Sequence, residues 1–339
     1  MHRSEISATI GVYQRLFDNV AGQSVDLGHW GALAFDAITE FSPGLADEIA
    51  GIAEGASQPL TSIAAINART EVLAAAGALT HECSTVVRLR AGLPPVSVQA
   101  WDWYADLADL WLIWEIPHAD GRHTTTVTEY GIVGKIGVNN RGLGIHFNIL
   151  HHQLDGHDQT RIGVPVHVLA RSILDEAADL NQAMVSAAQV SVSASTSLSM
   201  IAVRGTESAA VSVELNPAGV GYALPDKEGL LVHTNHFLST PATLHDTEPR
   251  TSPDTVIRYD MLRRKLAGRA ITTEDALQAL ASHLMGSGGT CCHIDPSLPP
   301  SGQFQTLATV VLDVAGGTLM AYPGGPCTAT ATEKEPNNA

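Results

Sequence analysis

The chain of 339 residues has only four cysteines, Cys83, Cys291, Cys292 and Cys327. Proteins that depend on disulfide bonds for their fold are much richer in cysteine, so a disulfide scaffold is excluded. The sequence also lacks any run of about eighteen apolar residues, the length that crosses a membrane. Its first twenty residues interrupt their apolar positions with charged and amide side chains, unlike a secretory signal. We therefore expect a soluble, cytoplasmic protein with no membrane partner.

Basic residues are scarce as well, with 19 Lys and Arg against 35 Asp and Glu and a formal net charge of −16. Proteins that bind nucleic acids neutralise phosphates with clustered basic side chains. The longest basic run here is Arg263–Lys265, which we expect on one helix. The composition therefore disfavours a nucleic-acid partner, whereas the hydrophobic share of 45% is high enough for a folded core.

The hydrophobic pattern alternates between the periods of helices and strands. Helical spacing is found over residues 26–77, with a break at 57–60, over 166–189, and in two segments after residue 224. The second of these begins with a capping box formed by Thr272 and Asp275. Alternating, β-branched segments predict strands over 83–104, 125–150, 190–224 and 305–324. Blocks of antiparallel strands between blocks of helices predict one α+β domain over residues 1–339, with helices covering the sheets.

Three polar side chains lie in surroundings that suit catalysis. Cys83 is found where helix gives way to strand, although a lone buried cysteine is more often structural. Asp102 lies between Trp101 and Trp103, where a carboxylate can be held in a partly dry wall, and its simpler interpretation is a turn cap. Asn235 follows an apolar strand and can present an amide N–H to an oxyanion, or simply close a turn.

Taken together and in this order, these elements resemble the peptidase C45 family, the acyl-coenzyme A:6-aminopenicillanic-acid acyltransferase-like branch of the N-terminal-nucleophile hydrolases. The segments that add to the resemblance are Asn67–Glu71, Gly134–Asn139, Gly142–Gly144 with Asn148, and Pro323–Cys327. The resemblance extends over about residues 60 to 327. It implies a four-layer αββα sandwich that is made as an inactive precursor.

The resemblance also implies a self-processing reaction. The bond between Glu82 and Cys83 would be cut to leave a small chain, 1–82, which stays as the partner of the large chain, 83–339. Cys83 would then carry a free α-amine beside its thiol. An α-amine has an ordinary pKa of about 7.7–8.0, so near neutrality it can accept the thiol proton and return it to a leaving amine.

By the same resemblance, Asp102 would orient the amine and the substrate, and Asn235 would donate to the oxyanion. The side chains expected to line the substrate pocket are Trp101, Trp103, Tyr104 and His236. The aromatic ones among them are equally consistent with core packing. Two departures from the family are visible, since relatives commonly have Gly in place of Glu82 and Asn in place of Ala100.

The expected function is therefore cleavage of the C–N bond of a non-peptide or small N-acyl amide through an acyl-Cys83 intermediate, without a cofactor. Hydrolysis is favoured because few Lys and Arg are present to bind a polyanionic acyl donor. An acyl-coenzyme A-dependent N-acyltransferase is one alternative, and a non-catalytic binding protein that retained the fold is another. The partner is a small amide, and a homo-oligomer is left open.

A histidine-rich segment suggests a different chemistry, a metal-dependent hydrolase. His151, His152 and His157, together with Asp158, could hold an ion, and Cys291–His293 offers softer ligands. Neither segment has the two-pair spacing of common zinc sites, and the first is typical of a polar loop after a strand. We therefore predict no metal site and interpret the two adjacent cysteines as packing residues.

Overall fold

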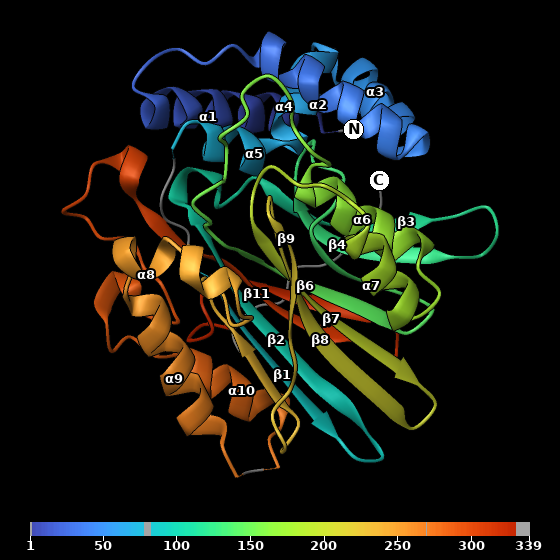
Figure 1. Cartoon of the computed structure of the whole chain (residues 1–339), viewed down its shortest axis with the longest axis vertical. Helices are drawn as coiled ribbons and strands as arrows, with labels where there is room; N and C mark the ends of the chain where they lie inside the picture. Colours follow the sequence, from blue (N-terminus) through green and yellow to red (C-terminus); the bar gives the residue numbers. More distant parts are fainter. Residues whose placement is uncertain (1, 78–82, 269, 330–339) are drawn as a thin grey trace.

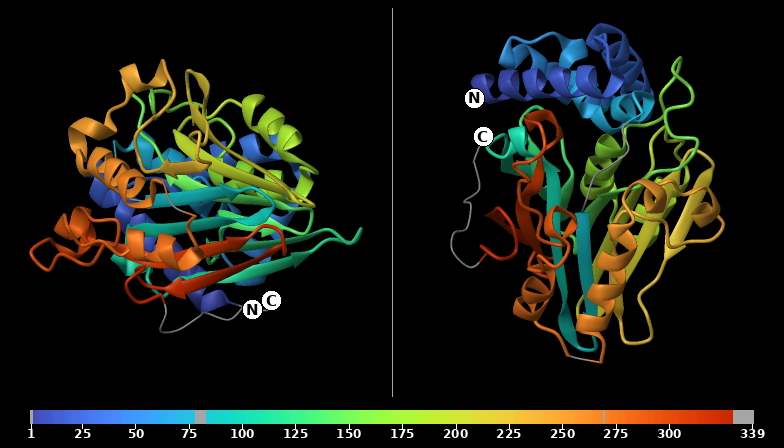
Figure 2. Two further views of the ribbon diagram at one scale, coloured as in Figure 1. Left: turned by 90° about the horizontal axis from the view of Figure 1, so that it is seen from below. Right: turned by 90° about the vertical axis from the view of Figure 1, so that its left-hand side faces the viewer.

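The computed structural model describes residues 2–77, 83–268 and 270–329. Two antiparallel sheets pack face to face, with helices on both outer faces (Figures 1 and 2). The strand order is β10-β1-β2-β11-β12 in one sheet and β3-β4-β5-β6-β7-β8-β9 in the other. This arrangement confirms the predicted four-layer αββα architecture of the α+β class.

The five-stranded sheet carries the candidate nucleophile. Its strands are β1 (Cys83–Arg90), β2 (Leu93–Tyr104), β10 (Leu230–His233), β11 (Phe304–Asp313) and β12 (Thr318–Pro323). Side chains alternate between the two faces of a strand. Val86 accordingly joins the apolar cluster beneath the outer helices, whereas Val87 joins the larger cluster between the sheets. Both faces of this sheet are therefore buried.

The seven-stranded sheet forms the second inner layer. Its strands are β3 (Trp111–Pro117), β4 (His123–Glu129), β5 (Ile136–Asn139), β6 (Leu143–Ile149), β7 (Thr196–Arg204), β8 (Glu207–Asn216) and β9 (Gly219–Ala223). The two layers approach closely at Gly144 in β6, where an added Cβ would lie 2.7 Å from Cγ2 of Val314. The segment 125–150 that was predicted to form strands contains β4, β5 and β6, and β3 is an additional strand.

Two helical layers cover the sandwich (Figure 1). The helices over the seven-stranded sheet are α6 (Val166–Glu176) and α7 (Leu180–Ala188), and those beside the five-stranded sheet are α8 (Glu248–Thr251), α9 (Asp254–Leu266) and α10 (Thr273–Leu280). The helix predicted over 166–189 is two helices, because Asp179 starts a new one by accepting a hydrogen bond from the Gln182 backbone N–H at 2.9 Å. The predicted capping box of Thr272 and Asp275 is confirmed.

The remaining helices form a cap across one end of the sandwich (Figure 2, right). They are α1 (Arg3–Ala21), α2 (Leu27–Phe41), α3 (Pro43–Ala56), α4 (Leu60–Asn67) and α5 (Arg69–Ala75). The helical prediction for 26–77 with its break near Ser57 is confirmed, and α1 is an additional helix. Across residues 2–77, 83–268 and 270–329, no helix combines the length and the hydropathy that a membrane span requires.

A buried ion pair joins the cap to the sandwich. Arg69 of α5 lies 2.8 Å from Glu129 at the end of β4, and both side chains are fully buried. Tyr13 of α1 donates its hydroxyl to the same carboxylate oxygen at 2.7 Å, and Trp103 of β2 donates its indole N–H to the Tyr13 hydroxyl at 2.9 Å. Although burial opposes ionisation, the positive charge of Arg69 holds the pKa of Glu129 below its ordinary value. The strand that carries Trp103 is thus connected to the cap by polar contacts as well as by packing.

A second buried carboxylate, Glu71 of α5, supplies a pH-dependent contribution to stability. One of its oxygens accepts the backbone N–H of Val166 at 2.9 Å, and burial raises the pKa of Glu71 to about 7. Between its ordinary pKa of 4.5 and about 7, the carboxyl is ionised in the unfolded chain and protonated in the folded one. This group therefore lowers the free energy of unfolding as the pH rises through that window.

We expect Glu71→Gln, which keeps the oxygen acceptor and cannot ionise, to lose less stability than the wild type when the pH rises from about 5 to above about 7. Urea denaturation at the two pH values measures the difference. Glu54→Gln, on the exposed side of α3, is the matched control and should follow the wild type. The same pH dependence in Glu71→Gln and wild type would contradict the assignment.

Candidate active site

Cys83 is the first residue of β1 and lies opposite Trp101 in β2. Its side chain is buried, and its backbone N–H donates to Oδ1 of Asn235 at 2.8 Å. Its thiol donates to the backbone oxygen of Asp102, with sulfur and oxygen 3.8 Å apart. The structure thus brings together the three residues that were predicted to be catalytic. Glu82, and with it the predicted cleavage bond, lies outside the described residues.

Asn235 follows the end of β10, and hydrogen bonds from its backbone and from its side chain hold it in place. Its backbone N–H donates to the Thr255 hydroxyl at 2.9 Å, and its side-chain nitrogen donates to the Ile149 carbonyl at 2.9 Å. These contacts direct Oδ1 at the nitrogen of Cys83, a contact that the family resemblance does not give to Asn235. An amide nitrogen carries two N–H groups, so the second remains chemically able to donate to an oxyanion. That role stays a prediction.

Asp102 is fully buried in β2, and its carboxylate accepts a hydrogen bond from the Thr306 hydroxyl of β11. The same hydroxyl accepts the backbone N–H of Cys292 at 3.0 Å. The contact between Asp102 and Cys83 therefore runs through the Asp102 backbone oxygen, and the carboxylate is oriented by Thr306. Its predicted role toward the amine and the substrate stays a prediction.

Arg258 of α9 is a site residue that the sequence analysis missed. It is fully buried, and its guanidinium donates to the Cys83 carbonyl at 3.0 Å, the Ser84 hydroxyl at 3.1 Å and Oδ1 of Asn235 at 3.1 Å. A fourth contact, at 2.9 Å, joins it to Asp254 one turn earlier. In sequence this Asp–Arg pair at a spacing of four resembles an ordinary surface pair on a helix. The Arg258 guanidinium instead holds Cys83 and Asn235 in fixed positions relative to each other.

Lys135 is a second cation that lies close to the site and was missed. It is buried, and its ammonium lies 3.8 Å from the centre of the Trp101 ring and 5.4 Å from that of Trp103. Burial lowers the pKa of Lys135 to about 7, opposed chiefly by the negative charge of Glu129. In the sequence analysis Lys135 was included only as part of the segment Gly134–Asn139, which adds to the family resemblance.

The environment keeps the Cys83 thiol protonated in the intact chain. Burial, and after it the charge of Asp102, raise the pKa of the thiol to about 12. Lys135 and Arg258 act in the opposite direction because each favours the thiolate. A thiol in this position needs a base to become a nucleophile near neutral pH.

The four residues predicted to line the substrate pocket lie near the candidate trio of Cys83, Asp102 and Asn235, but they also take part in packing. The Trp101 ring meets Trp111 edge-on at 6.3 Å, and Tyr104 packs on Phe304 at 4.2 Å. His236 lies between Thr255 and the edge of a tyrosine ring. Within the described residues, the buried indole N–H of Trp101 has no acceptor. The pocket assignment stays a prediction, and Trp101 has the free donor that a substrate could use.

The histidines of the proposed metal-dependent hydrolase are not brought together. The His151 ring faces Glu248 at 3.6 Å, the His152 ring accepts the backbone N–H of Leu154 at 3.2 Å, and His157 is exposed. Among the residues that the structure describes, these three do not form a group with ligand atoms close enough to share an ion. The geometry therefore does not support this alternative.

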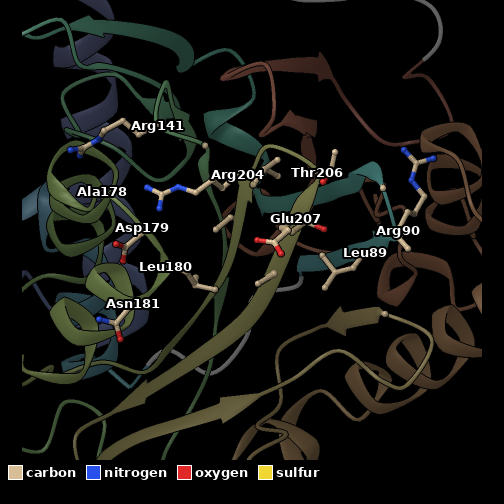
Figure 3. A pocket seen from close by; sticks show the side chains of 18 of the residues that line it. Leu89, Arg90, Arg141, Ala178, Asp179, Leu180, Asn181, Arg204, Thr206 and Glu207 are labelled. Atoms are coloured by element: carbon tan, nitrogen blue, oxygen red, sulfur yellow. The ribbon is translucent and has the colours of Figure 1, made fainter.

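A groove of about 980 Å³ lies away from the candidate trio (Figure 3). Arg141 and Arg204 lie on one side of it and Arg90 on the other, with Glu207 between them. Arg90 ends the strand that Cys83 begins, so the groove is separated from the thiol by roughly 23 Å of extended chain. Although the groove is large, it is too far from Cys83 to be the pocket in which this thiol would react.

The model of the family described as acyl-coenzyme A:6-aminopenicillanic acid acyl-transferase matches residues 94–326. The chain belongs to this family. Asp102 and Asn235 lie inside the matched residues of this acyltransferase-family protein, and Cys83 precedes them. The family assignment made from the sequence is confirmed, and the family is described as one of acyl-transferases.

One curated relative of this acyltransferase-family protein comes from Emericella nidulans and is described as the 40 kDa form of acyl-coenzyme A:6-aminopenicillanic-acid-acyltransferase. It is 27% identical over 228 residues, which cover 66% of this chain and 59% of the relative. The chain thus matches less than two thirds of that relative's length.

Two solved structures can be compared with this chain. The N-acylethanolamine-hydrolyzing acid amidase ortholog of Caenorhabditis elegans has a TM-score of 0.50 and 12% identity, covering 69% of this chain and 93% of that one. The penicillin V acylase of Agrobacterium tumefaciens has a TM-score of 0.41 and 10% identity, covering 71% and 83%. The first likeness supports the N-terminal-nucleophile hydrolase fold.

Arg258→Lys should slow catalysis on the order of tenfold to a hundredfold. A single ammonium cannot bind Cys83 and Asn235 at the same time in the geometry that the planar guanidinium provides. Steady-state kinetics measure the loss, which should fall on kcat more than on KM. Arg263→Lys, on the exposed side of the same helix, is the control and should behave as wild type. Unchanged kcat in a folded Arg258→Lys variant would exclude the positioning role.

Proposed function

We propose that the protein is a self-processing amidohydrolase that cleaves the C–N bond of a small, non-peptide N-acyl amide through an acyl-Cys83 thioester. The observation that carries the proposal is the 2.8 Å contact between the Cys83 nitrogen and Oδ1 of Asn235. A nucleophile whose own amine serves as the base needs that nitrogen held in a fixed place beside the thiol. Arg258 supports this geometry because it binds both residues.

Processing would create the base that the thiol lacks. In this reaction the Cys83 thiol attacks the carbonyl of Glu82, the thiol proton passes to the Cys83 nitrogen as the C–N bond between the two residues breaks, and water hydrolyses the resulting thioester. The products are the chains 1–82 and 83–339, and Cys83 gains an α-amine with an ordinary pKa of about 7.7–8.0. Since burial raises the pKa of the thiol to about 12, this amine supplies the proton acceptor that deprotonates it.

Turnover then follows from the same groups. The amine accepts the thiol proton as sulfur attacks the substrate carbonyl, and the second N–H of Asn235 donates to the oxyanion. The C–N bond breaks as the proton passes to the leaving amine, and water hydrolyses the thioester to release the acid. Lys135 and Arg258 stabilise the negative charge that develops on sulfur, since both already favour the Cys83 thiolate.

Hydrolysis is favoured over transfer from acyl-coenzyme A because the two cations around Cys83 are already engaged. Arg258 is occupied by three contacts to Cys83, Ser84 and Asn235, and Lys135 is buried over Trp101. Neither is placed to bind the phosphates of a polyanionic donor. The alternative, an acyl-coenzyme A-dependent N-acyltransferase, is supported by the description of the Emericella nidulans relative.

We expect denaturing mass spectrometry of the purified protein to show two chains, 1–82 and 83–339. Cys83→Ala should remain one chain of 339 residues, because it lacks the sulfur that attacks the bond. Cys292→Ala, which removes another buried thiol, should be cut like the wild type. Circular dichroism establishes that the uncut variant is folded. An active protein that remains one intact chain would rule out processing.

Incubation with N-acyl amides of increasing acyl length should release acid and amine, and acid quenching should trap an acyl group on Cys83. Chromatography of the products and peptide mapping measure the two results. Adding acyl-coenzyme A and a free amine tests the transferase alternative, which predicts a new amide and free coenzyme A. Undiminished turnover by Cys83→Ala would refute the nucleophile, whichever acyl acceptor is used.

A further inference from the structure

Four potential metal ligands converge outside the catalytic trio: His283, Cys291, His293 and Cys327. One ligand atom from each residue lies within 4.8 Å of the ligand atoms of all the others. Within residues 2–77, 83–268 and 270–329, no other group of three or more such side chains meets this condition. All four cysteines of the chain are free thiols, so the two sulfurs of the cluster are not bonded to each other.

The spacing within the cluster fits a single tetrahedral ion. The Cys291 and Cys327 sulfurs are 3.4 Å apart, and Nε2 of His293 lies 3.6 Å and 3.5 Å from them. Nε2 of His283 lies 3.0 Å from Nε2 of His293. Ligands at about 2.3 Å (sulfur) and about 2.0–2.1 Å (nitrogen) from one zinc ion are separated by roughly 3.3–3.8 Å from each other. Small side-chain movements therefore suffice to place all four on one ion.

The backbone around the cluster makes room for the sulfur atoms. The first three ligands lie in the segment between α10 and β11, and Cys327 follows β12, so two parts of the chain that are distant in sequence meet here. At Gly325 an added Cβ would lie 2.5 Å from the Cys291 sulfur, so a larger residue would displace the thiol. Sequence spacing could not show this site, because its fourth ligand comes from another segment.

We propose that these four side chains form a structural Zn²⁺ site. Two thiolates and two imidazoles in tetrahedral arrangement are the donor set that zinc prefers. Binding releases one proton from each thiol, so one Zn²⁺ replaces two H⁺. Because protein atoms fill all four positions, the ion has no open position for water or substrate, which makes its role structural. The site lies outside the proposed catalytic chemistry and replaces the earlier prediction of no metal.

The ion would act on the active site through a short chain of contacts. Cys292 lies between two of the ligands, and its backbone exchanges two hydrogen bonds with Thr306, each of 3.0 Å. The Thr306 hydroxyl in turn orients the Asp102 carboxylate. Zinc would therefore fix the segment that holds Thr306 in place, and its removal should lower thermal stability and loosen Asp102.

The test measures metal in the full-length protein without any substrate, so it is independent of the proposed reaction. Elemental analysis of the protein purified without chelator should find one Zn²⁺ for each copy of residues 83–339 in wild type. Cys291→Ser with Cys327→Ser should hold none. Cys292→Ser is the matched control, because its sulfur donates to the Ser287 carbonyl and is not one of the four ligands. It should keep the full zinc content.

A second measurement covers the case in which the double variant does not fold. Wild type stripped by a chelator under reducing conditions should melt at a lower temperature and regain its stability with Zn²⁺. Refilling with Co²⁺ should produce thiolate-to-cobalt charge-transfer absorption and the intense visible bands of tetrahedral cobalt. Reduced wild type that binds neither ion, or a cobalt spectrum without thiolate bands, would overturn the proposal. So would a native protein whose mass shows a disulfide between Cys291 and Cys327.

Discussion

The pairing of β1 with β2 is the constraint on which the site depends. It sets Cys83 opposite Trp101, and thereby brings the thiol to the backbone oxygen of Asp102. A slip of one residue would turn every side chain of the strand to the other face. Val86 would then leave the cluster beneath the helices and Val87 the cluster between the sheets. Because both faces are buried, packing along the whole strand fixes the position of its first residue.

The charges around Cys83 are carried by elements that come from distant parts of the chain. Arg258 reaches the site from the outer helical layer, while Lys135 approaches from the inner side over Trp101. Burying a charge is costly unless it is paired or hydrogen-bonded. Arg258 meets that requirement through Asp254 and its acceptors, whereas burial lowers the pKa of Lys135 to about 7. The two cations are therefore not equivalent: one is permanently charged, and the other changes charge near neutral pH.

The hydrophobic period predicted the alternating blocks of helices and strands because that period is a local property, and the family resemblance implied the four layers. The resemblance also named Cys83, Asp102 and Asn235, which lie together in the structure, while their catalytic roles stay predictions. It treated α6 and α7 as one helix because the capping contact of Asp179 does not interrupt the apolar pattern. Arg258 was missed because an Asp–Arg pair at a spacing of four has the same sequence pattern whether the arginine is buried or lies on the surface. His151 and His157 entered the sequence analysis only as an alternative metal site, and the structure does not bring them together because neighbours in a loop can face different directions. Contacts between distant segments needed the structure.

The buried pair of Arg69 and Glu129 has a consequence for the unfolding of a processed molecule. Removing one partner of such a pair costs about 3–5 kcal/mol, because the other charge is left without compensation in the interior. The cap is therefore an integral part of the sandwich, even if no peptide bond joins the two. A molecule cut before Cys83 would unfold as a dissociation into two chains, and its melting temperature would rise with protein concentration, as for a heterodimer.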